Sequence, residues 1–181
     1  MARIVILTGP PGAGKTTLAA HLAAGAARGV HVHGDVFYNF LAQPIAPVLP
    51  ESQAQNETVI RAALRTAAAF AAGGYEVFLD GIFGPWFLPL VADELAPTGL
   101  ATEYVVLRID LRRARARATT RVVDPAEARV VEQMHASFAD LGGHGAHALD
   151  VGDRTTQELA AELARRSAAG QFRLALDRDR C

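Results

Sequence analysis

The sequence predicts an α/β protein built on a parallel sheet that helices cover on both faces. Five short apolar runs of strand type recur along the chain, at residues 3–7, 30–33, 76–79, 102–109 and 146–150. Segments rich in Ala, Leu and Arg, typical of helices, separate them. This alternation requires crossover connections, which make the strands parallel and place helices on both faces. We expect the 181 residues to form one domain over residues 1–181.

The first strand leads into a glycine-rich loop, GPPGAGKT at residues 9–16, and a helix is predicted over residues 18–27. Gly9, Gly12 and Gly14 let backbone N–H groups turn toward an anion, and the helix points its positive end at the same place. Because a strand, this loop and a helix follow in the required order, a chance glycine-rich turn is rejected. The loop predicts binding of nucleotide phosphates, with Thr16 as a ligand of Mg²⁺. Further nucleotide contacts are expected from Pro10, Ala13 and Thr17.

Lys15 is the only lysine, and arginine accounts for the other 17 of the 18 Lys and Arg residues. A slim ammonium on a flexible stem reaches between the β- and γ-phosphates, whereas a planar guanidinium does not fit the same curl of backbone. We therefore expect Lys15 to bind the phosphates and to take part in catalysis. A guanine-binding Asn-Lys-x-Asp motif is excluded, because it needs a second lysine.

The second predicted strand leads to a carboxylate, Asp35. In a parallel sheet, the carboxyl ends of strands beside the first strand–helix loop face the ligand crevice. Asp35 is the candidate base that accepts a proton as a substrate hydroxyl attacks phosphorus. The alternative is that Asp35 caps a helix beginning near Val36. His33 is a candidate substrate contact, although a core or surface histidine is the more common case.

Residues 42–52 hold three prolines and resist assignment to a helix or strand. A long loop of this kind within a compact domain is often a binding loop or lid. A long helix is expected over residues 55–72, ending at two glycines just before the third strand.

The third predicted strand ends at Asp80, and Gly81 follows directly. An Asp after three apolar residues is placed to face Mg²⁺ or its waters, so we expect Asp80 and Thr16 to hold the metal. Gly81 stands where many motor-type ATPases carry the glutamate that activates water. Transfer of phosphate is therefore favoured over hydrolysis.

Five arginines follow the fourth predicted strand, within residues 112–121. At helical spacing Arg113, Arg117 and Arg121 share one face. Guanidiniums in a lid over about residues 115–128 would offset charge on the transferring phosphoryl group and stack on adenine. Arg117 and Arg121 are the candidate catalytic arginines, and Arg117 is also a nucleotide contact. For Arg112, Arg113 and Arg115 a solvated basic face is preferred, and the sequence leaves open whether they belong to the site.

The last third of the chain carries helix signals. Asp124 as N-cap and Pro125 as first helical residue begin a long helix expected to end near residues 142–143. Another helix is expected from about Thr155 to Ala168. A C-terminal tail over about residues 170–181 ends in the single cysteine, Cys181, to which we assign no function.

Aromatic residues gather after both acidic strand ends, and in this fold they would converge over one crevice. They would form an apolar acceptor pocket, although we expect at least half of them to pack as core. The candidate substrate contacts, together with His33, are Phe37, Tyr38, Phe83 and Trp86.

With residues 9–16, Gly34 and Asp35, residues 79–81 and the arginines in this order, the chain resembles the small P-loop kinases. It looks most like the chloramphenicol phosphotransferase-like group, with gluconate, shikimate and adenylylsulfate kinases as more distant relatives. The resemblance covers about residues 3–166. It implies a three-layer P-loop NTPase fold, with a five-stranded parallel sheet of order 2-3-1-4-5 and an arginine-bearing lid. It also implies ATP, Mg²⁺, Asp35 as base and phosphorylation of a small-molecule hydroxyl.

Departures from those relatives bear on the acceptor. Adenylate kinases carry an arginine after the proline that follows the third strand, and Trp86 stands there in this chain, which disfavours a nucleoside monophosphate. Shikimate and gluconate kinases bind anionic acceptors with arginines, whereas here only Arg61 and Arg65 are candidates near the pocket. An uncharged or amphipathic hydroxyl compound, such as an antibiotic, fits better. The alternatives are a kinase of a sugar acid such as gluconate, and an ATPase or nucleotide-dependent switch that acts on a protein partner.

Composition limits the remaining classes. The net charge is −1 and both signs are interspersed, so no nucleic-acid partner is expected. No apolar stretch approaches the roughly 18–20 residues of a membrane span, and the first strand leaves no room for a signal peptide. We expect a cytoplasmic protein, a monomer or a homodimer, without a membrane partner.

Overall fold

The structure is a computed structural model that describes residues 2–119 and 125–176, without the side chains of residues 117–119 and 125–128. Within these residues five strands form one parallel sheet in the order β2-β3-β1-β4-β5, which confirms the predicted fold class and strand order. The strands are β1 (Arg3–Thr8), β2 (Gly29–His33), β3 (Glu76–Asp80), β4 (Thr102–Arg108) and β5 (Ala148–Asp150). The α-helices are α1 (Lys15–Gly25), α2 (Gln53–Ala72), α3 (Leu88–Leu95), α4 (Leu111–Thr119), α5 (Pro125–Ser137) and α6 (Thr156–Ala168).

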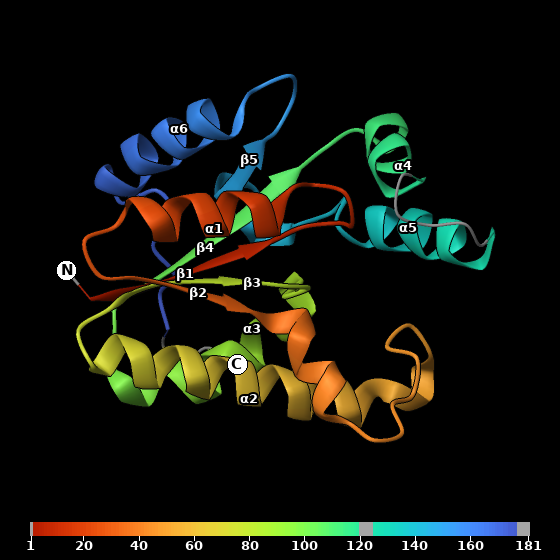
Figure 1. The fold of residues 1–181 in the computed structure, drawn as a ribbon, viewed down its shortest axis with the longest axis horizontal. Helices are drawn as coiled ribbons and strands as arrows, with labels where there is room; N and C mark the ends of the chain where they lie inside the picture. The colour runs from red at the N-terminus through yellow and green to blue at the C-terminus, as the bar shows by residue number, and fades with distance from the viewer. Residues whose placement is uncertain (1, 120–124, 177–181) are drawn as a thin grey trace.

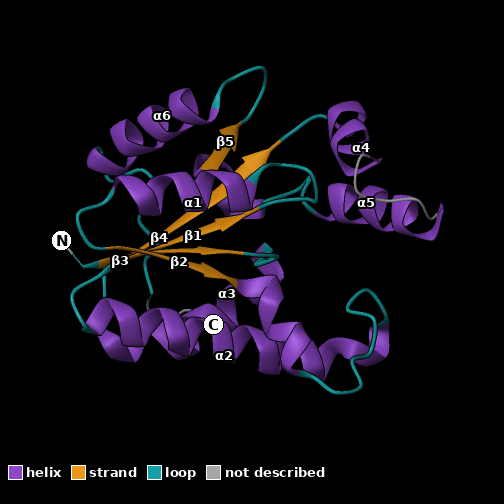
Figure 2. Cartoon of the chain, viewed as in Figure 1, coloured by secondary structure: helices purple, strands orange, loops and turns teal. Residues whose placement is uncertain are grey.

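Helices cover the sheet as two layers (Figures 1 and 2). Helices α1 and α6 lie over one face, and α2 and α3 lie over the other. Helices α4 and α5 pack together beyond the carboxyl ends of β1 and β4. Among the described residues, no helix combines the length and the apolar character that crossing a membrane requires.

The strands are apolar on both sides because each face of the sheet is buried under helices. In β1, Ile4 and Ile6 belong to the core on the side of α2 and α3. Val5 and Leu7, which alternate with them, belong to the core on the side of α1 and α6. All four side chains are fully buried. The apolar runs seen in the sequence are therefore interior strands of a covered sheet.

The strand register brings the ends of β1, β2 and β3 together at one edge of the sheet. Leu7 of β1 and His33 of β2 both pair with Asp80 of β3. The loops that follow these three strands therefore begin side by side, at the carboxyl edge where ligands bind in open parallel sheets.

Several predicted boundaries differ from the structure, and α1 spans Lys15–Gly25 where residues 18–27 were predicted. Helix α5 ends at Ser137 rather than near residues 142–143, and a 3₁₀ segment over Gly142–His147 takes the first two positions of the predicted fifth strand. The proposed N-cap, Asp124, lies outside the described residues. The start of α6 agrees with prediction, because Thr155 and Glu158 form a reciprocal capping box.

The segment expected as a tail is part of the packed fold as far as residue 176. Phe172 is fully buried, and its carbonyl accepts a hydrogen bond from the Tyr104 amide (2.9 Å). The Leu174 amide donates to the carbonyl of Thr102 (2.9 Å), so this stretch is held along β4. Cys181 lies outside the described residues.

Gly9 is required by both backbone conformation and space. Its φ is +136°, and an added Cβ would lie 2.4 Å from the Leu107 carbonyl oxygen. We expect Gly9→Ala to lower the free energy of unfolding by about 3 kcal/mol, since it combines backbone strain with a clash against backbone. Chemical denaturation measures this loss.

Gly14→Ala is the matched control for Gly9→Ala. Gly14 also has a positive φ, +86°, but nothing lies within 4 Å of its added Cβ. It should lose only about 1 kcal/mol, from conformational strain alone. Equal losses for the two variants would show that the contact with Leu107 does not matter.

Candidate functional site

The phosphate loop encloses the Lys15 ammonium. Nζ of Lys15 donates to the carbonyl oxygens of Gly9 (3.0 Å) and Pro10 (3.2 Å), and the residue is 8% exposed. Helix α1 starts directly at Lys15, and its N-cap, Gly14, has no side chain to cap the first turn. The first backbone N–H groups and the ammonium thus lie at one helix terminus, which is suited to an anion.

Opposing effects act on the charge of Lys15. Burial lowers the pKa of the Lys15 ammonium, while the negative charges of Asp35 and Asp80 raise it. The carboxylates of Asp35, which follows β2, and Asp80, at the end of β3, therefore lie close enough to act on the lysine. A bound phosphate would add negative charge and favour the ammonium form further.

Asp80 is fully buried and holds the start of α1. Its Oδ2 accepts from the Thr16 hydroxyl (2.6 Å), and its Oδ1 accepts from Nε2 of His31 (2.6 Å). A carboxylate and a hydroxyl are the hard oxygen donors that Mg²⁺ takes, beside substrate phosphates. Thr16 and Asp80, already in contact, therefore fit the predicted magnesium site.

His31 was not among the site residues predicted from the sequence, whereas His33 was. Alternation along β2 nevertheless puts both side chains on the face that Asp80 shares. The two rings lie 6.0 Å apart. Nε2 of His33 lies 3.9 Å from Oδ2 of Asp80 and 4.0 Å from Oδ2 of Asp35, so His33 stands between the carboxylates. The available signal for His31 was its two-residue spacing from His33, which places both histidines on the same face of β2, next to β3.

Asp35 does not cap a helix. The 3₁₀ segment Gly34–Phe40 starts one residue before it, with His33 at the N-cap position and no side-chain cap. The Asp35 carboxylate is instead more than half exposed and lines a cavity. The capping alternative is therefore wrong, and the carboxylate is accessible to a ligand.

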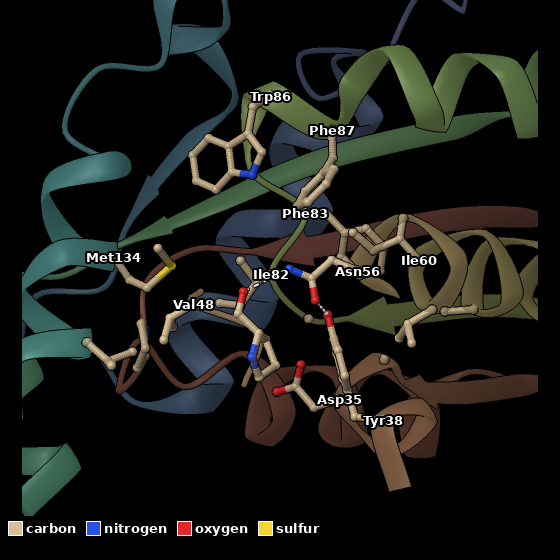
Figure 3. A pocket seen from close by; sticks show the side chains of 17 residues that line it. Asp35, Tyr38, Val48, Asn56, Ile60, Ile82, Phe83, Trp86, Phe87 and Met134 are labelled. Atoms are coloured by element: carbon tan, nitrogen blue, oxygen red, sulfur yellow. Dashed lines mark hydrogen bonds between the residues drawn. The ribbon is translucent and has the colours of Figure 1, made fainter. Parts of the chain in front are cut away.

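A cavity of about 430 Å³ adjoins the phosphate loop (Figure 3). Pro11 of the loop is among the lining residues, and Asp35 lies across the cavity from Trp86. Most of the lining is apolar. Among the described residues that line it, Asp35 is the only carboxylate and none is basic.

The structure brings some predicted substrate contacts to this cavity and not others. Tyr38, Phe83 and Trp86 line it. Phe83 is only 2% exposed, so it also belongs to the core. Phe37 packs against the core and edge-on against Phe40, with ring centroids 5.7 Å apart, and is not part of the lining. His33 is also absent from the lining.

Tyr38 is a hydrogen-bond donor in this cavity. Its hydroxyl donates to Oδ1 of Asn56 (3.0 Å). Burial, with a contribution from the charge of Asp35, raises the pKa of Tyr38 to about 12. The phenol therefore stays protonated at neutral pH, which leaves Asp35 as the candidate base among the described lining residues.

Asn56 fixes the proline-rich stretch as a wall of the cavity. Its Nδ2 donates to the Pro47 carbonyl (2.8 Å) and to the Ser52 hydroxyl (3.0 Å), and Pro47 and Val48 line the cavity. Residues 42–52 thus contribute to the wall of the cavity, and their role as a binding loop stays a prediction. Nothing in the sequence singled out Asn56, because its partners come from two other segments.

Arg61 and Arg65 do not reach the cavity. Both are held by Glu94 of α3, at 2.6 Å and 2.7 Å. The hydrogen bonds that Arg65 and Arg61 donate to the Glu94 carboxylate lower the pKa of that carboxyl. The expectation that these arginines lie near the acceptor is wrong, since a carboxylate on the neighbouring helix holds them away.

Two of the arginines after β4 pair with carboxylates outside the cavity lining. Arg113 pairs with Asp110 (3.1 Å) and Asp153 (2.7 Å), and Arg115 pairs with Glu132 of α5 (2.5 Å). Arg112 is exposed. Arg117 lies in α4, but its side chain is outside the described residues, as is Arg121 altogether.

Gly81 leaves no space for a catalytic glutamate. A Cβ at this position would lie 2.7 Å from the ring of Phe83, which is packed in the core. The absence of a water-activating carboxylate after Asp80 is therefore built into the packing of the site.

Comparisons with known proteins agree with this geometry. The AAA domain family matches residues 4–141. The chain is similar in structure to the tunicamycin resistance protein of Deinococcus radiodurans, with 15% identity and a TM-score of 0.69, covering 97% of this chain and 99% of that chain. It is also similar to the shikimate kinase of Bacteroides thetaiotaomicron (18% identity, TM-score 0.67, covering 92% and 98%). The APS kinase of Mycobacterium tuberculosis, solved with AMPPNP and APS, gives 21% identity, a TM-score of 0.66 and coverage of 92% and 98%. No curated protein matches in sequence.

Proposed function

Since this chain belongs to the AAA domain family and has the fold of small-molecule P-loop kinases, we propose that it transfers the γ-phosphate of ATP to a hydroxyl of a small molecule. One observation carries the proposal. A mostly apolar cavity adjoins the phosphate loop through Pro11, and Asp35 is the only carboxylate among its described lining residues. A nucleotide site and an acceptor site thus meet at a candidate base.

The roles of the residues follow from their positions. The acceptor oxygen attacks the γ-phosphorus, the bond from that phosphorus to the β,γ-bridging oxygen breaks, and ADP leaves. Asp35 takes the proton of the attacking hydroxyl. Lys15 and the N-terminus of α1 offset the negative charge on the phosphates.

Thr16 and Asp80 would hold Mg²⁺, which supplies further charge neutralisation at the phosphates. The hydrogen bond from His31 fixes the orientation of the Asp80 carboxylate. Arg117 and Arg121 remain our proposal for the lid cations, and Gly12, Gly14 and Thr17 for further nucleotide contacts.

The acceptor we propose is uncharged or amphipathic, such as an antibiotic. Anionic acceptors need cations, and the described lining of the cavity holds none, while Arg61 and Arg65 are tied to Glu94. This disfavours a sugar acid such as gluconate. Tyr38, Phe83 and Trp86 would contact the apolar body of the acceptor.

The proposal predicts that ADP release depends on an acceptor. Purified protein with ATP and Mg²⁺ should form ADP only when a suitable hydroxyl compound is added from a panel that includes antibiotics and sugar acids. Mass spectrometry should then find the phosphorylated compound. An ATPase or a protein-directed switch would instead hydrolyse ATP without any acceptor, and a binding module would do neither. Vigorous hydrolysis that survives Asp35→Asn would reject the kinase assignment.

A further inference from the structure

A second cavity lies beside the acceptor cavity. Its volume is about 460 Å³, and Asn56, Trp86 and Phe87 line both cavities. Its remaining walls come from the proline-rich stretch, the start of α2 and helix α3, with Leu49, Gln53, Glu57 and Asp93 among them. The two cavities are therefore neighbours across one shared boundary rather than separate features of the surface.

The boundary is held in place by packing. The Trp86 indole is folded back over Gly84, where an added Cβ would lie 2.3 Å from the ring. Its centroid lies 5.3 Å from that of Phe138 and 6.0 Å from that of Phe87. Trp86 nevertheless stays 45% exposed. An aromatic surface fixed on one side and open on the other is suited to contact a ligand.

The side chain of Asn56, the polar residue of the boundary, already has hydrogen-bond partners within the protein. Its amide accepts from Tyr38 and donates to Pro47 and Ser52 (Figure 3 shows the Tyr38 contact). Asn56 therefore holds the walls, and a ligand that crosses the boundary passes against the rings of Trp86 and Phe87.

The second cavity is lined by more carboxylates than the first, where Asp35 is the only one among the described lining residues. Its charged lining residues, among those described, are Glu57 and Asp93. Arg61 lies 3.7 Å from Asp93, but its short contact, 2.6 Å, is with Glu94. The cavity therefore disfavours an anionic group and favours a polar group that donates hydrogen bonds.

We propose that the acceptor is a two-part molecule. Its hydroxyl-bearing, apolar part occupies the cavity at Asp35, and a polar, non-anionic part extends past Trp86 into the second cavity, beside Glu57. This proposal rests on the phosphotransferase function and adds the class of acceptor to it. It makes Trp86 and Glu57 specificity-determining residues of the reaction.

The test uses three synthetic aryl alcohols that share one ring and one hydroxyl. The first has no extension, the second has a short chain ending in a primary ammonium, and the third has the same chain ending in a carboxylate. Trp86 is the only tryptophan of the chain, so its emission reports occupancy of the boundary directly. The ammonium probe should bind wild-type protein about two- to fivefold more tightly than the other two, as expected for a partly exposed ion pair.

Three variants make the result specific. Glu57→Gln should remove the preference for the ammonium probe, whereas Glu51→Gln should keep it, because Glu51 is exposed and is not among the residues lining either cavity. Gly84→Ala should change the Trp86 emission and weaken both extended probes, since the new methyl displaces the indole. Equal binding of the three probes, no Trp86 response to any of them, or an unchanged preference in Glu57→Gln would overturn the proposal.

The phosphotransferase assignment is tested separately with the unextended alcohol. Its phosphorylation by ATP, followed by mass spectrometry, needs no second cavity. Transfer without any Glu57-dependent preference would reject the two-part acceptor alone. Selective binding without transfer to any of the three probes would instead count against the phosphotransferase assignment.

Discussion

Asp35→Asn is expected to slow acceptor phosphorylation by about 10²–10⁴-fold, the usual contribution of a positioned general base. Asparagine keeps the size of the side chain but cannot take the proton of the attacking hydroxyl. Because the Asp35 carboxylate is exposed to the cavity and hydrogen-bonds no described residue, the exchange should leave folding intact. Steady-state kinetics with a phosphorylated acceptor, together with a thermal melt, checks both statements.

A matched control separates this effect from a general change in charge. Asp150, an exposed carboxylate at the end of β5, pairs loosely with Arg108 at 3.7 Å, far along the sheet order from β2. Asp150→Asn should retain the wild-type rate. If Asp35→Asn also retained it, the base would have to be another group, and the assignment of Asp35 would be wrong.

Lys15→Arg should cost about 10²–10³-fold in phosphoryl transfer, comparable to the loss of a main charge stabiliser. The ammonium lies inside the loop, between the carbonyls of Gly9 and Pro10, and the residue is 8% exposed. A guanidinium keeps the charge but is wider and planar, so it cannot reach the phosphates without opening the loop. The defect should appear in kcat as well as in nucleotide affinity.

Arg154→Lys provides the control for an exchange between the two cations. Arg154 is exposed beyond β5, and the exchange preserves charge there too. It should leave transfer and nucleotide binding unchanged. Near-wild-type turnover of Lys15→Arg, measured beside this control, would refute the requirement for an ammonium.

Much of the scaffold could be read from local pattern. The five strands and the helices α1, α2 and α6 were predicted to within a few residues, because continuous apolar runs, caps and glycine boundaries are local signals. Helix α3 (Leu88–Leu95) was given no predicted range. The end of α5 was not predicted correctly, since Gly142 and Gly143 suggested a stop that the structure reaches at Ser137. Element boundaries depend on packing that a one-dimensional pattern does not contain.

The candidate site divides in the same way. The positions of Asp35 and Asp80 at one edge of the sheet could be predicted, because the carboxyl ends of parallel strands share that edge. The hydrogen bond from His31 to Asp80 and the salt bridges from Arg61 and Arg65 to Glu94 could not. Each depends on which side chain of a neighbouring element lies within reach, and this follows from register and helix rotation.

The sequence by itself determined the phosphate loop, because the backbone N–H groups and the lysine that we propose for phosphate binding lie within eight consecutive residues. Only the tertiary structure decided which residues form the proposed acceptor site. Its two cavities are assembled from the loops after β2 and β3, the proline-rich stretch and the start of α2, with α3 and α5 completing them. A contiguous motif carries its geometry in its own backbone, whereas a cavity between distant segments exists only after those segments have packed.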